Sequence, residues 1–487
     1  MSQLQRFFKD TLIYGFAAVL PKAINVLLVK LHTSSLTTSE YSVNTSFYVW
    51  AAYFNVVLTY GMETAFFRFF SKEQEKDKVV STAFISLVTT SLISLSFMLY
   101  FDLEISNFLG FSNPFYFDVL VWISILDTLI VIPFAYLRVV GKSKKYTLFR
   151  VLNIGVYAFF NVLFLAWIPN SDFLQKLLGT LYTSYYNPNF KEGYIFCANL
   201  LASAITFLCV LPIIFKIQFT FSKRLLLKMG KYSWPIFVAG IAYTTNENLD
   251  KLLLENWLGK SIMGAYAGAY KIGVIMSLFV MAFRLGAEPF FFNQASQKNA
   301  PKTYAIILKW FVIIGALFTL GIIVYIDLIA SLFLGDASFY TALSIVPVIV
   351  LANLFLGIYN NLSIWYKITD KTQYGMYFSV LGAFITIAML YLLIPTIGYM
   401  GAAWATLAAY STMLIVSFVI GQYKYPIPYK VGNSLFYIGL SIVLSTISFL
   451  KFQQNYICST LCILVFIATI TVKEKEEIKR MIRKKTT

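Results

Sequence analysis

The chain has 487 residues, of which 59% are hydrophobic and 13% charged, and its mean hydropathy is +0.72. Soluble domains carry about twice this fraction of charged residues, so the composition excludes a soluble protein and predicts an all-α integral membrane protein. The formal charge of +17 would suggest a nucleic-acid partner in a soluble chain. In a membrane protein, positive residues gather at the cytoplasmic side instead, so no such partner is expected.

Hydropathy predicts about fourteen membrane-spanning helices, because a segment of about 20 apolar residues is needed to cross about 30 Å of hydrocarbon. The first predicted span contains Pro21 and Lys22 and lacks a small-residue cleavage site, so we interpret it as a retained helix rather than a signal peptide. We expect the spans near residues 10–32, 41–63, 80–101, 116–138, 147–168, 192–217, 232–254, 261–284, 303–328, 342–365, 374–394, 400–421, 433–450 and 456–472.

The distribution of Lys and Arg predicts the topology. With both termini in the cytoplasm, 31 of the 39 Lys and Arg residues lie in cytoplasmic segments or their flanks. Because positive residues favour that side of the membrane, we expect both termini to be cytoplasmic. Trp167, Trp234, Trp257 and Trp365 lie at predicted span ends, where an interfacial aromatic belt is expected.

A short motif occurs twice in the chain. Residues 61–67 read GMETAFF and residues 286–292 read GAEPFFF, so both fit G-x-E-x-x-F-F. Each copy lies at the predicted cytoplasmic end of the second helix of a six-helix set. Two further turns, GKSKKY ending at Tyr146 and TDKTQY ending at Tyr374, match at nearly the same offset in sequence. The pattern indicates an internal duplication.

The duplication predicts two six-helix lobes. When the two halves of the sequence are aligned by the offset between the motif copies, Lys22 aligns with Glu247 and Asn25 aligns with Asp250. Because six is an even number, the lobes share one orientation, and we expect an axis along the membrane normal with the substrate path between them. We assign the lobes to residues 1–230 and 231–430, helices 13 and 14 to 431–472, and a basic cytoplasmic tail to 473–487.

Ionisable side chains occur inside the predicted spans, where each costs about 2.5 to 3.5 kcal/mol at the bilayer centre. Glu247 and Lys251 are four residues apart with the acid first, which favours an ion pair on a helix. Asn246 and Asp250 repeat the step, so all four lie on one side of the seventh span. Further ionisable groups within spans include Lys22, Asp127 and Lys271. We expect these groups to face a protein interior or a water-filled cavity.

Catalytic motifs are missing from the sequence. Gly141-Lys142-Ser143 has the end of a phosphate-binding loop without its leading glycine, so we interpret it as a basic turn. The longest predicted external loop, 169–193, is too short for a catalytic domain. The chain has one histidine and no cluster with metal-ligand spacing. We therefore expect no enzyme activity, no metal and no cofactor, apart from a coupling proton or sodium ion.

The motifs of the seventh and eighth spans resemble a known family. Residues 246–259 read NENLDKLLLENWLG and residues 264–273 read GAYAGAYKIG. Together with fourteen spans and the duplication, they resemble the polysaccharide transporter (O-antigen flippase) branch of the MATE-like (MOP) flippase superfamily. Asp250 and Lys251 match the end of the family's N-x-x-D-[KR] pattern, although its asparagine position is Glu247 here. The G-x-Y-x-x-A-Y-K pattern matches at every position, from Gly264 to Lys271.

The resemblance implies a flippase of the bacterial inner membrane that moves a polyprenyl-pyrophosphate-linked oligosaccharide for lipopolysaccharide or other surface polysaccharide, by alternating access. Its partners would be membrane lipids and the polysaccharide polymerase machinery. The candidate substrate-binding residues are Lys22, Asn25, Lys251 and Lys271; in the other interpretation each lysine simply pairs with a carboxylate. The candidates for ion coupling or gating are Glu63, Asp127, Glu247, Asp250 and Glu288, of which Glu63 and Glu288 fit a structural role equally well.

Three alternatives stay open. A multidrug cation antiporter of the same superfamily would share the fold and the mixed charges of the spans. A peptidoglycan-precursor flippase would differ mainly in its substrate. A membrane glycan polymerase or glycosyltransferase would need a larger external loop or a soluble domain than the sequence provides.

Overall fold

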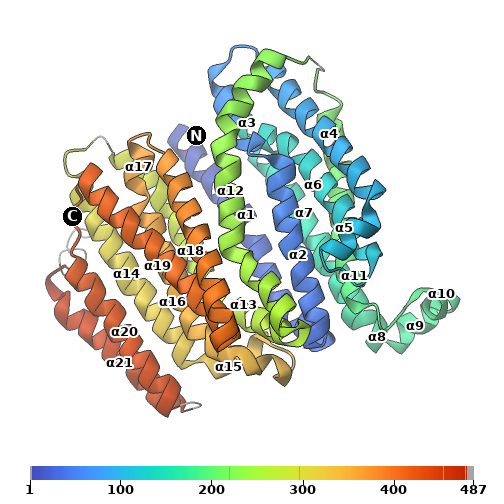
Figure 1. Ribbon diagram of the computed structural model, residues 1–487. Coiled ribbons are helices and arrows are strands. Elements are labelled where there is room, and N and C mark those ends of the chain that lie inside the picture. Colours follow the sequence, from blue (N-terminus) through green and yellow to red (C-terminus); the bar gives the residue numbers. More distant parts are fainter. Residues whose placement is uncertain (1–2, 219, 296, 453–454, 478, 480–487) are drawn as a thin grey trace. The chain divides into compact units, whose positions relative to one another are not determined.

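The computed structural model describes residues 3–218, 220–295, 297–452, 455–477 and 479 (Figure 1). Within these residues every regular element is a helix, which confirms the expected all-α fold. The chain divides into two compact units: Met1–Gly268 with Gly335–Phe339, and Ala269–Leu334 with Tyr340–Thr487. Each unit is described by itself, and the predicted lobe boundary at residue 230 stays a prediction about the duplication.

The first unit contains twelve α-helices, a π-helical turn and the start of a thirteenth helix. They are α1 (Gln3–Ser35), α2 (Thr38–Thr59), α3 (Met62–Lys72), α4 (Lys76–Tyr100), α5 (Asp102–Phe108), α6 (Pro114–Val139), α7 (Ser143–Val162), η1 (Leu163–Trp167), α8 (Ile168–Asn170), α9 (Asp172–Leu178), α10 (Thr180–Tyr185), α11 (Lys191–Ile214), α12 (Lys223–Leu258) and the beginning of α13 (Lys260–Gln294).

The second unit contains the rest of α13 and the helices that follow it. They are α14 (Ala300–Val324), α15 (Ile326–Phe333), most of the 3₁₀ helix η2 (Ala337–Ile345), α16 (Val346–Leu362), α17 (Ile364–Ile368), α18 (Gln373–Ile397), α19 (Tyr399–Lys424), α20 (Val431–Lys451) and α21 (Tyr456–Lys473).

Among the described residues, eleven helical segments are long and apolar enough to span a membrane. Each coincides with one of the fourteen predicted spans. The other three predicted spans fall on α1, α2 and α12, which contain 33, 22 and 36 residues and are therefore long enough to cross. Polar side chains lower the hydropathy of α2 and α12, and several side chains of α1 lie outside the described residues. The chain is a multi-pass membrane protein, and the count of fourteen stays a prediction.

The first unit has a local break that places the first copy of the duplicated motif. A capping box of Thr37 and Glu40 begins α2. The helix ends at Tyr60, which has a left-handed φ of 34°, and Gly61 follows with a φ of 72°. A Cβ at Gly61 would lie 3.0 Å from the carbonyl oxygen of Ser233 on α12, so glycine is required both by conformation and by close approach. The break orients α3, which carries Glu63.

The hydrophobic core of the first unit lies among α3, α4, α6, α11 and the start of α12. Met62, Ala65 and Phe66 of the motif are fully buried in it. On the other side of the unit, α1 packs on α7, where His32 Nε2 lies 2.8 Å from the side-chain oxygen of Asn161. This contact buries the single histidine of the chain between two helices.

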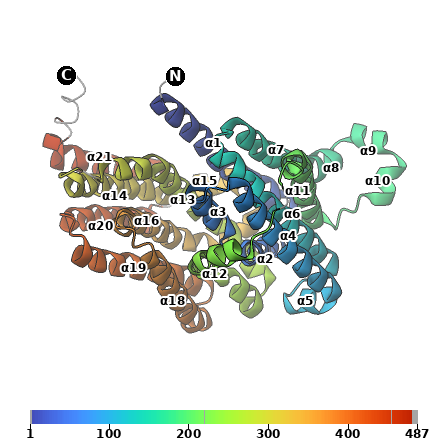
Figure 2. The same ribbon diagram turned by 90° about the horizontal axis from the view of Figure 1, so that it is seen from above.

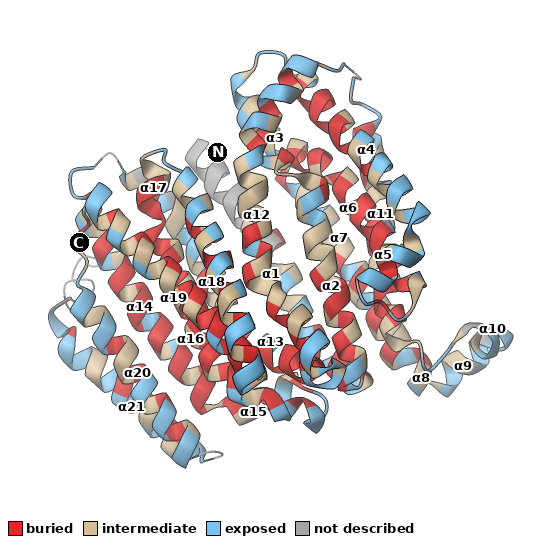
Figure 3. Cartoon of the chain, viewed as in Figure 1, coloured by how far each residue is buried: buried red, intermediate tan, exposed pale blue. Residues whose placement is uncertain are grey.

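In the second unit, α14 and α16 supply much of the buried core (Figure 3). The hairpin of α20 and α21 lies beside α14 in both views (Figures 1 and 2). Two serine hydroxyls fix the hairpin by donating to backbone carbonyls of α14: Ser441 to Ala316 at 2.8 Å and Ser459 to Val324 at 2.9 Å. Such bonds satisfy hydroxyls that lipid would leave without partners.

A buried charge cluster secures the last helix. Lys309 of α14 is 4% exposed, and its Nζ lies 2.8 Å from a carboxylate oxygen of Glu474 and also contacts Glu477. The hydroxyl of Tyr437 on α20 donates to the second oxygen of Glu474 at 3.2 Å. The cluster therefore joins α14, α20 and the end of α21 by charge-assisted hydrogen bonds.

One tryptophan differs from its expected place. Trp167, Trp234 and Trp257 are 50%, 62% and 40% exposed, as residues of an interfacial belt should be. Trp365 is only 2% exposed, so its assignment to the belt was wrong. Its ring lies 4.9 Å from that of Tyr374, in the turn that the sequence had matched to GKSKKY, and it packs against Gly421.

Replacing Lys309 with alanine is expected to destabilise the purified protein by about 3 to 5 kcal/mol, because Glu474 would stay buried as an unpaired charge. Thermal unfolding in detergent measures the change. Lys302→Ala, an exposed lysine on the same helix, serves as the control. Equal melting temperatures for the two variants would show that the cluster does not hold the hairpin.

Candidate functional site

The polar residues of α12 form a buried network with the start of α13. Lys251 Nζ lies 2.9 Å and 3.1 Å from the two carboxylate oxygens of Asp250 and donates to the backbone oxygen of Glu247 at 2.7 Å. The hydroxyl of Tyr266 donates to Asp250 at 2.7 Å. Asp250, Lys251 and Tyr266 are all buried. The Asp250–Lys251 pair is charge-neutral, which is how a low-dielectric interior tolerates ionised groups.

This geometry bears on the two predicted roles of Lys251, which are substrate binding and pairing with a carboxylate. The ion pair joins it to its neighbour Asp250, and the ammonium group is enclosed in the protein. Its enclosure favours a structural role over contact with a substrate. Asn246 is also buried, while Glu247 and Asn248 are partly exposed on the same helix.

The other predicted substrate-binding residues lie at accessible positions. Lys22 and Asn25 are exposed on α1, in the first unit, and Lys271 is exposed on α13, in the second unit. Lysine side chains within membrane spans need a polar surrounding, so such exposure fits a water-filled path. Their role in substrate binding stays a prediction.

A polar cavity of about 210 Å³ lies inside the first unit. Asp127 on α6 lines it and accepts a hydrogen bond of 2.8 Å from the hydroxyl of Ser203 on α11. Arg150 and Asn153 on α7 face the same cavity, and the Asn153 amide donates to Thr206 at 3.0 Å. Its lining includes carboxylates, a guanidinium and several neutral polar groups within helices of spanning length. Such a cavity can hold water and exchange a proton or a small cation.

Glu63 stands at one edge of this cavity. Its carboxylate accepts a bond of 3.2 Å from the guanidinium of Arg138, the last basic residue of α6. The guanidinium also lies 4.7 Å from the ring centre of Phe67, the final residue of the first motif copy. The motif therefore brings its acid and its aromatic ring to one cation.

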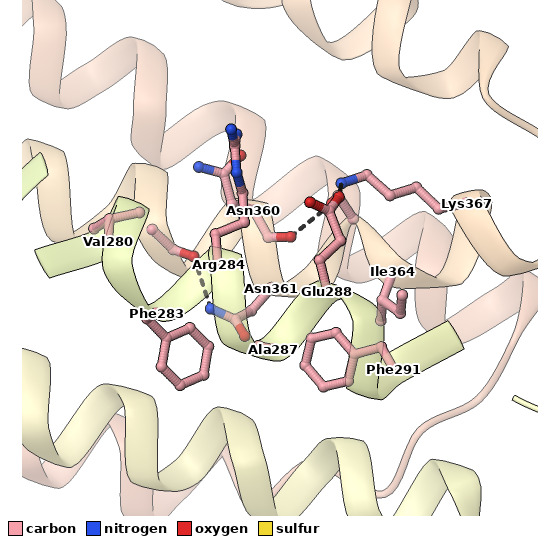
Figure 4. Close-up of a pocket in the computed structure, with 12 residues that line it drawn as sticks. Val280, Phe283, Arg284, Ala287, Glu288, Phe291, Asn360, Asn361, Ile364 and Lys367 are labelled. Atoms are coloured by element: carbon pink, nitrogen blue, oxygen red, sulfur yellow. Dashed lines mark hydrogen bonds and ion pairs between the residues drawn. The ribbon is translucent and has the colours of Figure 1, made fainter. Parts of the chain in front are cut away.

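A smaller pocket lies in the second unit (Figure 4). Glu288 accepts from Lys367 of α17 at 2.6 Å, and Arg284 lies one turn before Glu288 on α13. The amide of Asn361 donates to the carbonyl of Gly357 at 3.1 Å, whereas its buried side-chain oxygen has no partner among the described residues. The pocket therefore has both cationic groups and an unused acceptor.

Each of the two pockets is lined by the acid of one motif copy. Glu63 and Glu288 hold the same position in the two motif copies, and their partners Arg138 and Lys367 are separated by nearly the same offset in sequence. In both units, the acid of the motif pairs with a base near the end of a later spanning segment, Pro114–Val139 or Ala337–Ile368. Two ion pairs with matching offsets support the duplication more strongly than the short motif does. The pairing favours a structural or gating role for both glutamates over a role in ion coupling.

Sequence reasoning missed the basic residues that line these pockets or pair with their acids. Arg138, Arg150, Arg284 and Lys367 were counted only as positive residues that set the topology. The predicted duplication could have indicated Lys367. Adding the offset between the turns that end at Tyr146 and Tyr374 to the position of Arg138 gives the residue next to Lys367. Asn153 and Asn361 gave no signal, since a single polar residue in an apolar span has many explanations.

Comparisons with known proteins identify the class of fold. The MatE family model matches residues 235–392. Among solved structures, a lipid II flippase, MurJ, in an inward closed conformation, is similar over 96% of this chain and 100% of its own, with a TM-score of 0.72 and 15% identity. A search of curated proteins finds no significant match.

Multidrug transporters share the fold as well. An inward-facing multidrug resistance MATE family transporter of the MOP superfamily is similar over 85% of this chain and 94% of its own, with a TM-score of 0.63 and 13% identity. A MOP superfamily transporter from Pyrococcus furiosus, whose binding pocket has reversed polarity, covers 85% and 95%, with a TM-score of 0.60 and 15% identity. The chain therefore has the fold of the MOP superfamily transporters, as the sequence resemblance predicted.

Reversing one charge of an equivalent ion pair is expected to lower the melting temperature, and reversing both charges to restore it. Glu288→Lys places a third cation beside Lys367 and Arg284, whereas Glu288→Lys with Lys367→Glu rebuilds the attraction. Glu63 and Arg138 give the matching cycle in the first unit. Because these pairs are 28% to 44% exposed, each should contribute about 0.5 to 1 kcal/mol.

The more exposed pair of Glu75 and Lys78 is the control, and its reversal should change little. Double reversals that are no more stable than the single ones would contradict the pairing.

Proposed function

We propose that the chain is a flippase that moves a polyprenyl-pyrophosphate-linked oligosaccharide from the cytoplasmic to the outer leaflet of the bacterial inner membrane, in the synthesis of O-antigen or another surface polysaccharide. The observation that carries the proposal is the extent of the structural match. The lipid II flippase is similar over 96% of the chain and the multidrug transporter over 85%. This difference in coverage is close to the share of the chain from Val431 to the C-terminus, which contains α20 and α21.

The charges of the spans support an anionic substrate. Lys22 and Lys271 have exposed side chains, whereas the side chain of Lys251 is buried. Arg284 adds a further cation to the pocket of the second unit. Lysine acts as a point charge toward phosphate, and arginine can bind it in bidentate fashion. We infer that Lys22, with Asn25 near it on α1, and Lys271 each provide a polar position for the pyrophosphate on its path. Arg284 lies about 20 Å further along α13 than Lys271, so it would meet the pyrophosphate at a different depth.

The membrane potential supports export without another energy source. Two negative charges that leave a negative interior gain about 4 to 5 kcal/mol at about 100 mV. Alternating access of the two duplicated lobes is the mechanism that we propose for this movement. The Glu63–Arg138 and Glu288–Lys367 pairs would then open and close the cytoplasmic mouth.

Two other functions are kept as alternatives, each on a specific observation. The multidrug transporters share the fold, and the carboxylate of Asp127 faces a cavity that can take a cation. A peptidoglycan-precursor flippase is supported by the similarity to the lipid II flippase.

Proteoliposomes test the main proposal. Wild-type protein is expected to flip a fluorescent polyprenyl-pyrophosphate oligosaccharide, and Lys22→Ala, Lys271→Ala and Arg284→Ala should each slow flipping at least tenfold, since each loses a cation for the pyrophosphate. Lys30→Ala, which removes another exposed lysine of α1, should flip at the wild-type rate. Exchange of organic cations without any lipid flipping would replace the proposal with the antiporter.

Ion coupling is tested separately through Asp127. If the cavity of the first unit carries a proton or sodium ion, a gradient of that ion should accelerate flipping, and Asp127→Asn should remove the acceleration while leaving flipping driven by the membrane potential. Ser203→Ala, which removes only the hydroxyl bonded to Asp127, should shift the response to the gradient without abolishing it. Transport that is indifferent to every ion gradient would exclude coupling through this group.

A further inference from the structure

A second cavity in the first unit has no part in the proposed transport path. Its volume is about 160 Å³, and three lysines line it: Lys142, Lys145 and Lys216. Lys142 and Lys145 belong to the Gly141-Lys142-Ser143 turn and the first turn of α7, whereas Lys216 follows the end of α11. The fold thus brings together cations from two separate parts of the sequence.

Carboxylates balance little of the positive charge of these three lysines. Among the described residues, none of the three lysines has an ion pair with a carboxylate, and the single acid that lines the cavity is Asp77 at the start of α4. The N-terminus of α7 adds a partial positive charge at the same place. Like charges around one small volume repel each other, and an anion between them would relieve the repulsion.

The rest of the lining is largely apolar. Five hydrophobic residues complete much of the wall: Val80, Leu137, Pro212, Ile213 and Ile217. Cations on one side and hydrocarbon on the other match a molecule that has a phosphate group next to acyl chains. Inorganic phosphate would use the lysines but not the apolar wall.

The cavity also lies at the correct depth for a lipid headgroup. It stands where α6 and α11 end and where α4 and α7 begin, so it lies at one end of four helices of spanning length. The distribution of positive residues predicts that this end is cytoplasmic. Lysine side chains there can extend from the hydrocarbon edge toward phosphates of the leaflet.

We propose that the cavity of Lys142, Lys145 and Lys216 binds the phosphate of an anionic lipid at the cytoplasmic surface of the first unit. The site goes beyond the proposed function, because a lipid bound there does not have to be the transported one. The basic turn that does not match a nucleotide-binding loop would thereby have a function, since Lys216, just after α11, completes the site.

Native mass spectrometry of the full-length protein provides the test. The triple variant K142Q/K145Q/K216Q is compared with K144Q/K223Q/K231Q, which removes three exposed lysines from the same predicted cytoplasmic segments but none from the cavity. The two variants have equal net charge. Cardiolipin and phosphatidylglycerol are the anionic probes, and phosphatidylcholine is the neutral one.

The cavity variant is expected to bind the anionic lipids at least tenfold more weakly than wild type, while the control variant stays within about twofold and phosphatidylcholine binding is unchanged in both. Equal losses in the two variants would overturn the proposal, because they would reflect net charge alone. Lys145→Gln against its neighbour Lys144→Gln gives the same comparison with single substitutions if a triple variant fails to fold.

Two further binding measurements identify which kind of molecule supplies the phosphate group. Polyprenyl pyrophosphate that competes with cardiolipin for wild type, but not for the cavity variant, would show that the substrate lipid shares the site. Inorganic pyrophosphate that binds as tightly as either lipid would overturn the assignment to a lipid. Because these measurements involve no transport, the lipid site and the flippase proposal can fail independently.

Discussion

The cost of a charge in hydrocarbon shapes this structure more than any other constraint. Each ionisable group in a span must be neutralised, enclosed with polar partners, or placed where water reaches it. The chain shows the first two solutions, and the third is proposed for Lys22 and Lys271. Asp250 and Lys251 neutralise each other under the hydroxyl of Tyr266, Asp127 faces a polar cavity, and Lys22 and Lys271 are exposed. The location of each solution separates the groups that hold the fold from those available to a ligand.

The predicted duplication is supported more strongly by ion pairs than by sequence identity. Apolar positions in a span can exchange Leu, Ile, Val and Phe at little cost, so the identity between two lobes fades. An acid that pairs with a base is exchanged less freely, because its loss removes about 0.5 to 1 kcal/mol even from a half-exposed ion pair. Glu63 with Arg138 and Glu288 with Lys367 stand at nearly matching offsets, as the predicted duplication would place them, one pair with arginine and the other with lysine.

Much of the fold was predictable because membrane spans are marked by length and hydropathy. The spanning helices from α4 to α11 and from α13 to α21 follow the predicted ranges closely, since each contains a long apolar run. The side-chain partners of individual residues were harder to predict from the sequence. The i,i+4 spacing favoured Glu247 as the partner of Lys251, yet the ammonium group reaches the carboxylate of Asp250, because Tyr266 from the next helix holds that carboxylate in place. Trp365 shows the same limit, since its burial depends on Tyr374 and Gly421, which no local pattern reveals.

Because of the break at Tyr60 and Gly61, the two copies of the motif differ in how easily the helix can bend there. In the first copy the chain leaves the α-helical conformation for two residues, and Gly61 lies against the backbone of α12. In the second copy α13 continues through Gly286, whose Cβ position meets no neighbour. A pre-bent helix can pivot at its break with little loss of hydrogen bonding, whereas a continuous helix bends only by breaking bonds. The two copies of the motif would therefore differ in flexibility, with bending easier at Gly61 than at Gly286.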